Sequence, residues 1–191
     1  MITLLLHTGL RRGELCGLEW DDINFDLSLL DVQRTSLYLP EKGVFVDETK
    51  NSTSRRVLKL TPDAVQLLKR YRMWQNSERL RIGDQWAEEW EQRPRLFTTW
   101  DGKPLHPSTV TGWFHTFIER SDLPPISIHS LRHTNATLLI AAGTNLTTVA
   151  ARLGHANSTT TSKIYAHAIK SADQAAAEVL QDILHPVKKQ A

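Results

Sequence analysis

Apolar residues recur every three or four positions along most of this chain, which is the spacing of a helix with one buried face. The pattern predicts helices over residues 2–8, 12–20, 62–82, 107–120, 129–142, 146–153, 158–165 and 171–184. Several predicted boundaries carry helix-end signals: Pro62 follows Thr61 at a start, and Gly143 and Gly154 stand just after ends. The chain is therefore expected to be mostly helical.

Between the second and third predicted helices, apolar and polar residues alternate, which is typical of strands. The alternating runs cover residues 29–39, 44–50 and 55–60, and short turns at 40–43 and 51–54 separate them. They predict a three-stranded antiparallel sheet and place Lys50 at the mouth of a hairpin. The expected fold class is α+β, mostly helical, with a small three-stranded antiparallel sheet.

Two segments between the third and fourth predicted helices have weaker signals. Residues 83–95 are polar, with Trp86 and Trp90 four apart, and fit either a short helix or a surface excursion. Residues 96–100 are a further strand candidate, which the turn Asp101-Gly102 would end.

Composition narrows the class of protein. With 191 residues, 40% hydrophobic and 23% charged, the chain fits one globular domain. The longest apolar stretch, Met1–Leu6, is too short to cross a bilayer and lacks a basic leader and a cleavage site, so we expect a cytoplasmic protein without membrane contact. Cys16 is the single cysteine, which excludes an intrachain disulfide and a cysteine-based metal site. The net charge of +2 alone does not indicate nucleic acid, because DNA affinity depends on Lys and Arg gathered on one face.

The candidate chemistry is that of a phosphate site. The residues that indicate it are two arginines, two histidines and a tyrosine: Arg11, Arg132, His129, His155 and Tyr165. Arginine presents a planar, charged fork of donors that matches phosphate oxygens in pairs, and two forks can stabilise the charge of an in-line displacement. His129 and Arg132 are three apart on a predicted helix and therefore share a face. A neutral tyrosine needs a base or a cationic environment to attack, and either histidine could help it.

Zinc is the main alternative at these histidines. His129 and His133 are four apart, as in helical zinc pairs, but Ser130 stands where a zinc protease has its glutamate, and no third ligand is evident nearby. We therefore expect no metal. His133 is interpreted as a hydrogen-bonded structural histidine outside the catalytic set.

Four motifs occur in a fixed order along the chain: Thr8-Gly-Leu-Arg-Arg-Gly-Glu14, His129-Ser-Leu-Arg132, Leu153-Gly-His155 and Tyr165-Ala-His167. Together they resemble the catalytic domain of the tyrosine recombinase (phage integrase) family, from about Thr8 to about His167. The run 153–167 is most similar to integrases of phages and conjugative transposons. Each motif alone is a weak signal, but four in order over most of the chain are a strong one.

The resemblance implies the tyrosine recombinase catalytic fold and a role for each motif residue. Tyr165 would be the nucleophile in DNA cleavage through a 3′-phosphotyrosyl intermediate, and His129 would assist its proton transfer. The non-bridging phosphate oxygens would be contacted by Arg11, Arg132 and His155, and Glu14 would orient Arg11. The leaving 5′ oxygen would be protonated by Lys50 rather than by Lys42 or Lys59. Arg11 is preferred over Arg12 because the family pattern places this arginine three residues before the glutamate. Arg12 and Arg55 are expected to contact DNA, and no cofactor is implied.

The resemblance also implies partners and a domain organisation. We expect a catalytic domain over residues 1–170 and a tail over 171–191 that docks between subunits. The chain opens inside the helix that leads to Arg11, so we expect a shortened first helix and no core-binding domain. The implied partners are double-stranded DNA, a homotetramer on DNA in the full-length protein, and accessory DNA-bending or excision factors, at the bacterial nucleoid. Two alternatives stay open: a strand relaxase similar to type IB topoisomerases, and a catalytically idle DNA-binding module.

Overall fold

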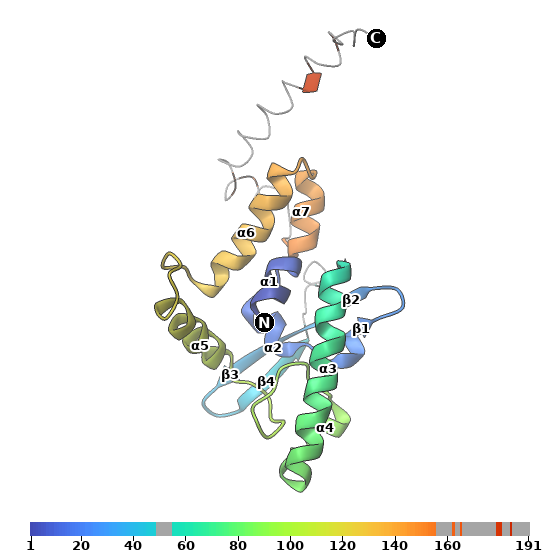
Figure 1. Ribbon diagram of the computed structural model, residues 1–191, viewed down its shortest axis with the longest axis vertical. Coiled ribbons are helices and arrows are strands. Elements are labelled where there is room, and N and C mark those ends of the chain that lie inside the picture. The colour runs from blue at the N-terminus through green and yellow to red at the C-terminus, as the bar shows by residue number, and fades with distance from the viewer. Residues whose placement is uncertain (49–54, 156–161, 163–164, 166–178, 181–183, 185–191) are drawn as a thin grey trace.

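The computed structural model describes residues 1–48 and 55–155, and also 162, 165, 179, 180 and 184 (Figure 1). The turn 51–54, Lys50 and most of the two helices expected after His155 lie outside these described residues.

Within the described residues the helices follow the predicted pattern, except that the second ends at Gly17 instead of at residue 20. They are α1 (Ile2–Thr8), α2 (Arg12–Gly17), α3 (Pro62–Ile82), α4 (Glu89–Gln92), α5 (Pro107–Glu119), α6 (Ile128–Ala141) and α7 (Leu146–Leu153), with 3-10 turns η1 (Trp20–Asp22) and η2 (Gly83–Gln85). Local signals set their ends. The Thr61 hydroxyl accepts a hydrogen bond from the backbone of Ala64 at the start of α3, and Gly9 ends α1 in the left-handed conformation with φ 65°. Residues 83–95 fold into η2 and α4, where Trp86 and Trp90 are buried.

The strands are β1 (Ile23–Asn24), β2 (Leu29–Val32), β3 (Arg34–Leu39), β4 (Gly43–Glu48) and β5 (Arg56–Lys59). They form two antiparallel sheets instead of the one predicted: a three-stranded sheet ordered β1-β2-β5, and the hairpin β3-β4. The predicted run 29–39 is thus divided at Gln33 between both sheets. Alternation determines which side chains face inward, but it does not determine the neighbour of a strand, and this is why the predicted pairing was wrong.

The strand predicted over residues 96–100 was also wrong. Only one isolated bridge, between Thr98 and Pro104, joins this segment to the turn that follows it. The turn itself is confirmed, since the backbone N–H of Thr99 donates to the Lys103 carbonyl across Asp101-Gly102. Leu96 and Phe97 are buried, so their apolar character reflects core packing and not a sheet.

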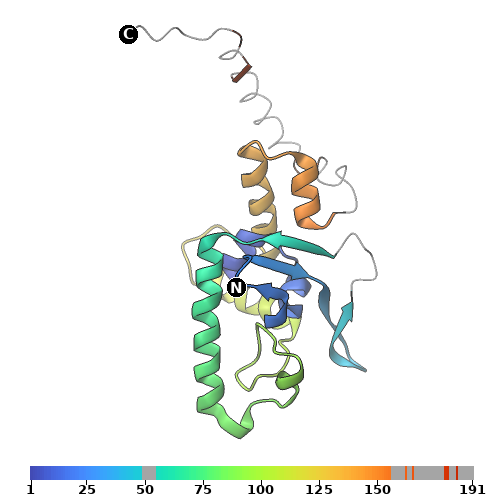
Figure 2. The ribbon, with the colours of Figure 1, turned by 90° about the vertical axis from the view of Figure 1, so that its right-hand side faces the viewer.

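Helix α1 lies at the centre of the molecule and contacts both α6 and α3 (Figure 1). Figure 2 shows α6 and α7 together at one end, while α3 runs away from them toward the other. The main core collects buried leucines from α1, α2, β2 and α3, and a smaller cluster of Ala136, Ile140, Val149, Leu153 and Tyr165 joins α6 to α7. No helix within the described residues is long and apolar enough to cross a membrane.

Candidate active site

Arg11 lies in the junction between α1 and α2, at the N-cap of α2. Its backbone N–H donates to Glu14 Oε2 at 2.8 Å, and its Nη1 donates to Glu14 Oε1 at 2.9 Å. The carboxylate of Glu14 is buried, whereas the side chain of Arg11 is 39% exposed. Glu14 therefore holds a guanidinium that still reaches the surface.

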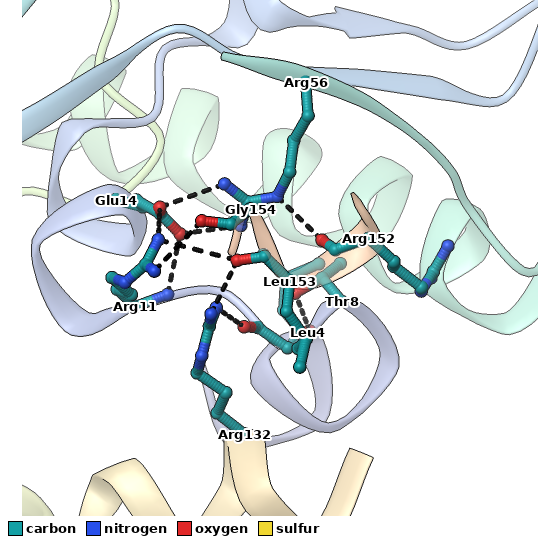
Figure 3. Close-up of polar contacts among 10 residues, drawn as sticks. Leu4, Thr8, Arg11, Glu14, Arg56, Arg132, Arg152, Leu153 and Gly154 are labelled. Atoms are coloured by element: carbon teal, nitrogen blue, oxygen red, sulfur yellow. Dashed lines mark hydrogen bonds and ion pairs between the residues drawn. The ribbon is translucent and has the colours of Figure 1, made fainter. Parts of the chain in front are cut away.

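The C-terminal end of α7 brings three arginines together (Figure 3). The carbonyl of Arg152 accepts from Arg56 Nε at 2.7 Å, that of Leu153 from Arg132 Nη2 at 2.5 Å, and that of Gly154 from Arg11 Nη2 at 3.2 Å. The last carbonyls of a helix have no partner within the helix and carry partial negative charge. They can therefore hold guanidiniums side by side that would otherwise repel one another.

Arg132 is the most enclosed of these cations, with 2% of its surface exposed. It comes from α6, and its Nη1 also donates to the carbonyl of Gly9 at 2.6 Å, in the α1–α2 junction. Burial, followed by the charge of Arg11, lowers the pKa of Arg132 to about 10. The side chain thus keeps its charge at neutral pH and ties α6 to both other parts of the site.

Arg56 was not among the predicted site residues. Its Nη1 and Nη2 donate to the two oxygens of Glu14 at 3.0 and 2.8 Å, so the carboxylate is shared between Arg11 and Arg56. The sequence held a signal for it: in strand β5, Arg56 falls on the inward face with Leu58, while Val57 and Lys59 face outward. An arginine at an inward position needs a buried acceptor, and this could have separated Arg56 from Arg55.

Gly154 follows α7 in the left-handed conformation, with φ 67°, and a Cβ there would lie 2.8 Å from Arg56 Nη1. We expect Gly154→Ala to lower the free energy of unfolding by more than the roughly 1–3 kcal/mol of backbone strain alone, because the Arg56 guanidinium must also move. Urea denaturation measures this effect. Gly143→Ala is the matched control, since Gly143 has φ 79° and an added Cβ meets nothing within 4 Å. Equal losses in the two variants would contradict the close packing of Arg56.

This cluster of side chains carries a net positive charge. Arg11 and Arg56 share the carboxylate of Glu14, and Arg132 lies beside them on the carbonyls of Gly9 and Leu153. Burial alone would raise the pKa of Glu14, but hydrogen bonds and charge from Arg56 and Arg11 lower it. Burial and then the charges of Arg132 and Arg11 lower the pKa of His155 to about 4, so its imidazole is neutral at pH 7. Such an excess of buried positive charge favours an anion.

Tyr165 contacts His133 of α6, the residue that follows Arg132 in the chain. Tyr165 is 4% exposed, and its hydroxyl lies 2.9 Å from Nδ1 of His133. The rings of His129 and His133 contact edge to face, with centroids 4.8 Å apart. The sequence predicts His133 to be a hydrogen-bonded structural histidine outside the catalytic set. It is hydrogen-bonded, but its partner is the hydroxyl of the candidate nucleophile.

A groove of about 830 Å³ lies beside the cluster, between α2, α5 and the start of α6. Arg11, Arg12 and His129 line it, and Phe114 and Ile118 of α5 supply apolar surface. Arg12 is exposed and its Nη1 donates to the Thr111 hydroxyl at 2.7 Å across the groove. The groove therefore brings the reachable guanidinium of Arg11 and the imidazole of His129 to one open surface.

The remaining predicted residues lie elsewhere. Arg55 is exposed just before β5, where it donates to Gln33. Lys50 lies outside the described residues. Of its two alternatives, Lys59 donates to the Leu27 carbonyl, and Lys42 lies over the Phe45 ring. Within residues 1–48, 55–155 and the few described beyond them, no three His, Cys, Asp or Glu side chains gather as a metal site would require.

A family model described as the phage integrase family matches residues 1–172. The chain belongs to the phage integrase family. This confirms the resemblance that the four motifs indicated. Among curated proteins, this integrase-family chain is 34% identical to a "Tyrosine recombinase XerC-like" of Caldanaerobacter subterraneus subsp. tengcongensis over 193 residues, covering 96% of the chain and 49% of that protein. It is 30% identical to the ICEBs1 integrase of Bacillus subtilis, covering 95% of the chain and 48% of that protein.

Solved structures agree with this assignment. The Tn1549 transposon integrase, in complex with transposon right end DNA, matches the integrase-family chain with a TM-score of 0.77 and 27% identity, over 94% of this chain and 57% of that one. The expected tyrosine recombinase catalytic fold, mostly helical with a small antiparallel sheet, is thereby confirmed. The chain spans about half the length of the curated relatives it matches.

Proposed function

We propose that this chain is the catalytic domain of a site-specific tyrosine recombinase or integrase. The observation that carries the proposal is the pair of guanidiniums from Arg11 and Arg132, held side by side by the carbonyls at the end of α7. Tyr165 is held by the same helix, α6, that supplies Arg132. An anion site next to a sequestered phenol fits phosphoryl transfer to tyrosine.

In the proposed reaction, the Tyr165 oxygen attacks the scissile phosphorus while the bond from phosphorus to the 5′ oxygen breaks. A 3′-phosphotyrosyl bond and a free 5′-hydroxyl result. Arg11, Arg132 and His155 stabilise the non-bridging oxygens, an imidazole of α6 takes the tyrosine proton, and Lys50 protonates the departing oxygen. A 5′-hydroxyl from a partner strand then attacks the phosphotyrosine. The phosphoester bond is conserved throughout, so the reaction needs no ATP, and the guanidiniums supply the charge that a metal would otherwise provide.

The proposed partner is double-stranded DNA. The related Tn1549 integrase is solved in complex with transposon right end DNA and with circular intermediate DNA, which supports this proposal. We further propose that the full-length protein works as a homotetramer on two DNA sites, with accessory DNA-bending or excision factors, at the bacterial nucleoid. Residues 1–170 would form the catalytic domain, and residues 171–191 would dock on a neighbouring subunit. Arg12 and Arg55 are proposed to contact the DNA backbone, since both are exposed.

The test of this function is a covalent adduct. The protein is incubated with suicide duplexes drawn from the DNA that flanks its gene, nicked so that the strand released by cleavage diffuses away. We expect a protein–DNA species that survives denaturing electrophoresis and forms equally in EDTA. Absence of any adduct contradicts the proposal, and an adduct that needs a divalent metal contradicts the metal-independent mechanism.

A second measurement separates the recombinase from its alternatives. A recombinase joins two sites and yields a strand-exchanged product. Relaxation of a supercoiled plasmid without joining would favour the topoisomerase-like relaxase. Sequence-specific binding without adduct on suicide DNA would favour the idle DNA-binding module.

The two adjacent arginines of the α1–α2 junction give a direct comparison. We expect Arg11→Ala to slow adduct formation by about 10²–10³-fold, the usual cost of losing one donor to a transition-state oxyanion. Arg12→Ala should weaken DNA binding mainly through a lost backbone contact and change the cleavage rate of bound DNA little, because Arg12 points across the groove to Thr111. Single-turnover cleavage with saturating protein measures the cleavage rate of bound DNA for both variants. A larger rate loss in Arg12→Ala would reverse the assignment.

A further inference from the structure

Helix α6 directs its polar residues to two different sides. Arg132 turns toward the carbonyls of Gly9 and Leu153, whereas His133 turns toward Tyr165. His129 precedes His133 by four residues and lies on the same face, with the two rings in edge-to-face contact. The two imidazoles therefore form a row that ends at the phenol, and His133 is the member that contacts it.

We propose that His133 is the base that takes the proton of Tyr165 when the tyrosine attacks DNA. This inference rests on the proposed function and assigns one step of it. The separation of 2.9 Å between Nδ1 of His133 and the Tyr165 oxygen lies within the range of a general base, about 2.6–3.2 Å. Because His133 touches the reacting atom itself, its role is catalytic and not merely one of positioning.

Tyr165 needs such a base because of its surroundings. The ring packs in the apolar cluster of Ala136, Ile140, Val149 and Leu153, and only 4% of the residue is exposed. Burial raises the pKa of Tyr165 above its ordinary value of 10.0, although the charge of Arg132 opposes this. The phenol is therefore neutral at pH 7, and bulk water has little access to it. A protein group in contact with the hydroxyl is the natural proton acceptor.

His129 has a different position, although the sequence favoured it for this step. It is exposed and lines the groove with Arg11. Partial burial lowers the pKa of His129, and the charges of His133, Arg132 and Arg11 lower it further. His129 therefore faces the groove, whereas His133 contacts the Tyr165 hydroxyl. His129 thus suits contact with DNA in the groove, and His133 suits the proton.

The step balances without any co-reactant. In the proposed step the phenol donates its hydrogen bond to the lone pair on Nδ1 of His133 before attack. During attack the bond from the Tyr165 oxygen to phosphorus forms, the bond from phosphorus to the 5′ oxygen breaks, and the phenol proton moves to Nδ1. The 5′ oxygen receives its proton from a separate acid. In the rejoining step the imidazolium returns its proton to the Tyr165 oxygen as that oxygen leaves phosphorus.

The test uses His133→Gln, which keeps a hydrogen-bond acceptor of similar reach but cannot hold the proton. We expect single-turnover adduct formation on suicide DNA to slow by about 10²–10⁴-fold, the usual contribution of a general base. Thr134→Ala, at an exposed neighbouring position of α6, is the matched control and should stay within about twofold of the unmodified protein. Urea denaturation of both variants checks that α6 remains folded.

A second arm distinguishes a base from a structural contact. Tyr165 is replaced by 3,5-difluorotyrosine, whose phenol is more acidic and needs less help to lose its proton. In the His133→Gln background this replacement should recover at least about tenfold of the lost rate, since the absent base matters less. A purely structural defect would not respond to the acidity of the nucleophile.

The outcomes separate this inference from the function on which it rests. If the unmodified protein forms the adduct but His133→Gln cleaves within about threefold of it, His133 is not the base and the recombinase function stands. A slow His133→Gln variant that difluorotyrosine does not rescue overturns the base role in the same way. If the unmodified protein forms no adduct on any suicide site, both proposals fail together.

Discussion

Tyr165→Phe is expected to abolish covalent adduct formation on suicide DNA while leaving the fold and DNA binding intact. The substitution removes the one oxygen that would attack phosphorus and keeps the ring that packs between α6 and α7. The lost hydrogen bond to His133 should cost only about 0.5–1.5 kcal/mol of folding free energy. Denaturing electrophoresis measures the adduct, and a gel shift with the same duplex measures binding.

Tyr71→Phe is the matched control for this result. Tyr71 is a tyrosine of α3 whose ring packs against Trp74 and Phe97, and burial raises the pKa of its phenol to about 12. It packs against the main core on α3, so its hydroxyl should have no part in cleavage. Adduct formation by Tyr165→Phe at the level of the unmodified protein would remove Tyr165 from the mechanism, and loss of adduct in Tyr71→Phe instead would transfer that role.

Arg132→Lys is expected to slow adduct formation by about 10²–10³-fold, even though the charge is kept. The guanidinium spans two carbonyls, those of Gly9 and Leu153, at 2.6 and 2.5 Å. A single ammonium on a flexible stem cannot hold both and present a planar fork to a phosphate oxygen. The variant should also lose roughly 1–3 kcal/mol of stability, because a buried acceptor is left unpaired.

Arg152→Lys separates the catalytic loss from the structural one. Arg152 is also partly buried and donates to backbone carbonyls, those of His7 and Lys59, but it faces away from the cluster around Glu14. We expect it to lower stability with little change in the cleavage rate of the folded protein. Urea denaturation and single-turnover cleavage are compared for both variants. Equal rate losses in the two would show that the effect of Arg132 is only structural.

Several features of the fold were predictable because their causes are local. Thr61 and Pro62 start α3, and Gly9 ends α1, through hydrogen bonds and backbone angles that involve only neighbouring residues. The hairpin β3-β4 was predictable for the same reason, since its turn lies between adjacent runs. The pairing of β2 with β5 was not predictable. The hairpin β3-β4 lies between these two strands in the chain, and the alternation of apolar and polar residues does not indicate which strand pairs with which.

The sequence by itself determined the family and the candidate chemistry, because the residue types of Arg11, Arg132, His155 and Tyr165 and their order are written in short motifs. The tertiary structure alone decided how these residues are held. The end of α7 meets Arg11, Arg56 and Arg132 from three separate elements, and partial charge on helix carbonyls has no signature in residue order. The same holds for His133: helical spacing places it beside His129, but only the packing of the Tyr165 side chain against α6 puts the ring nitrogen of His133 next to the phenol.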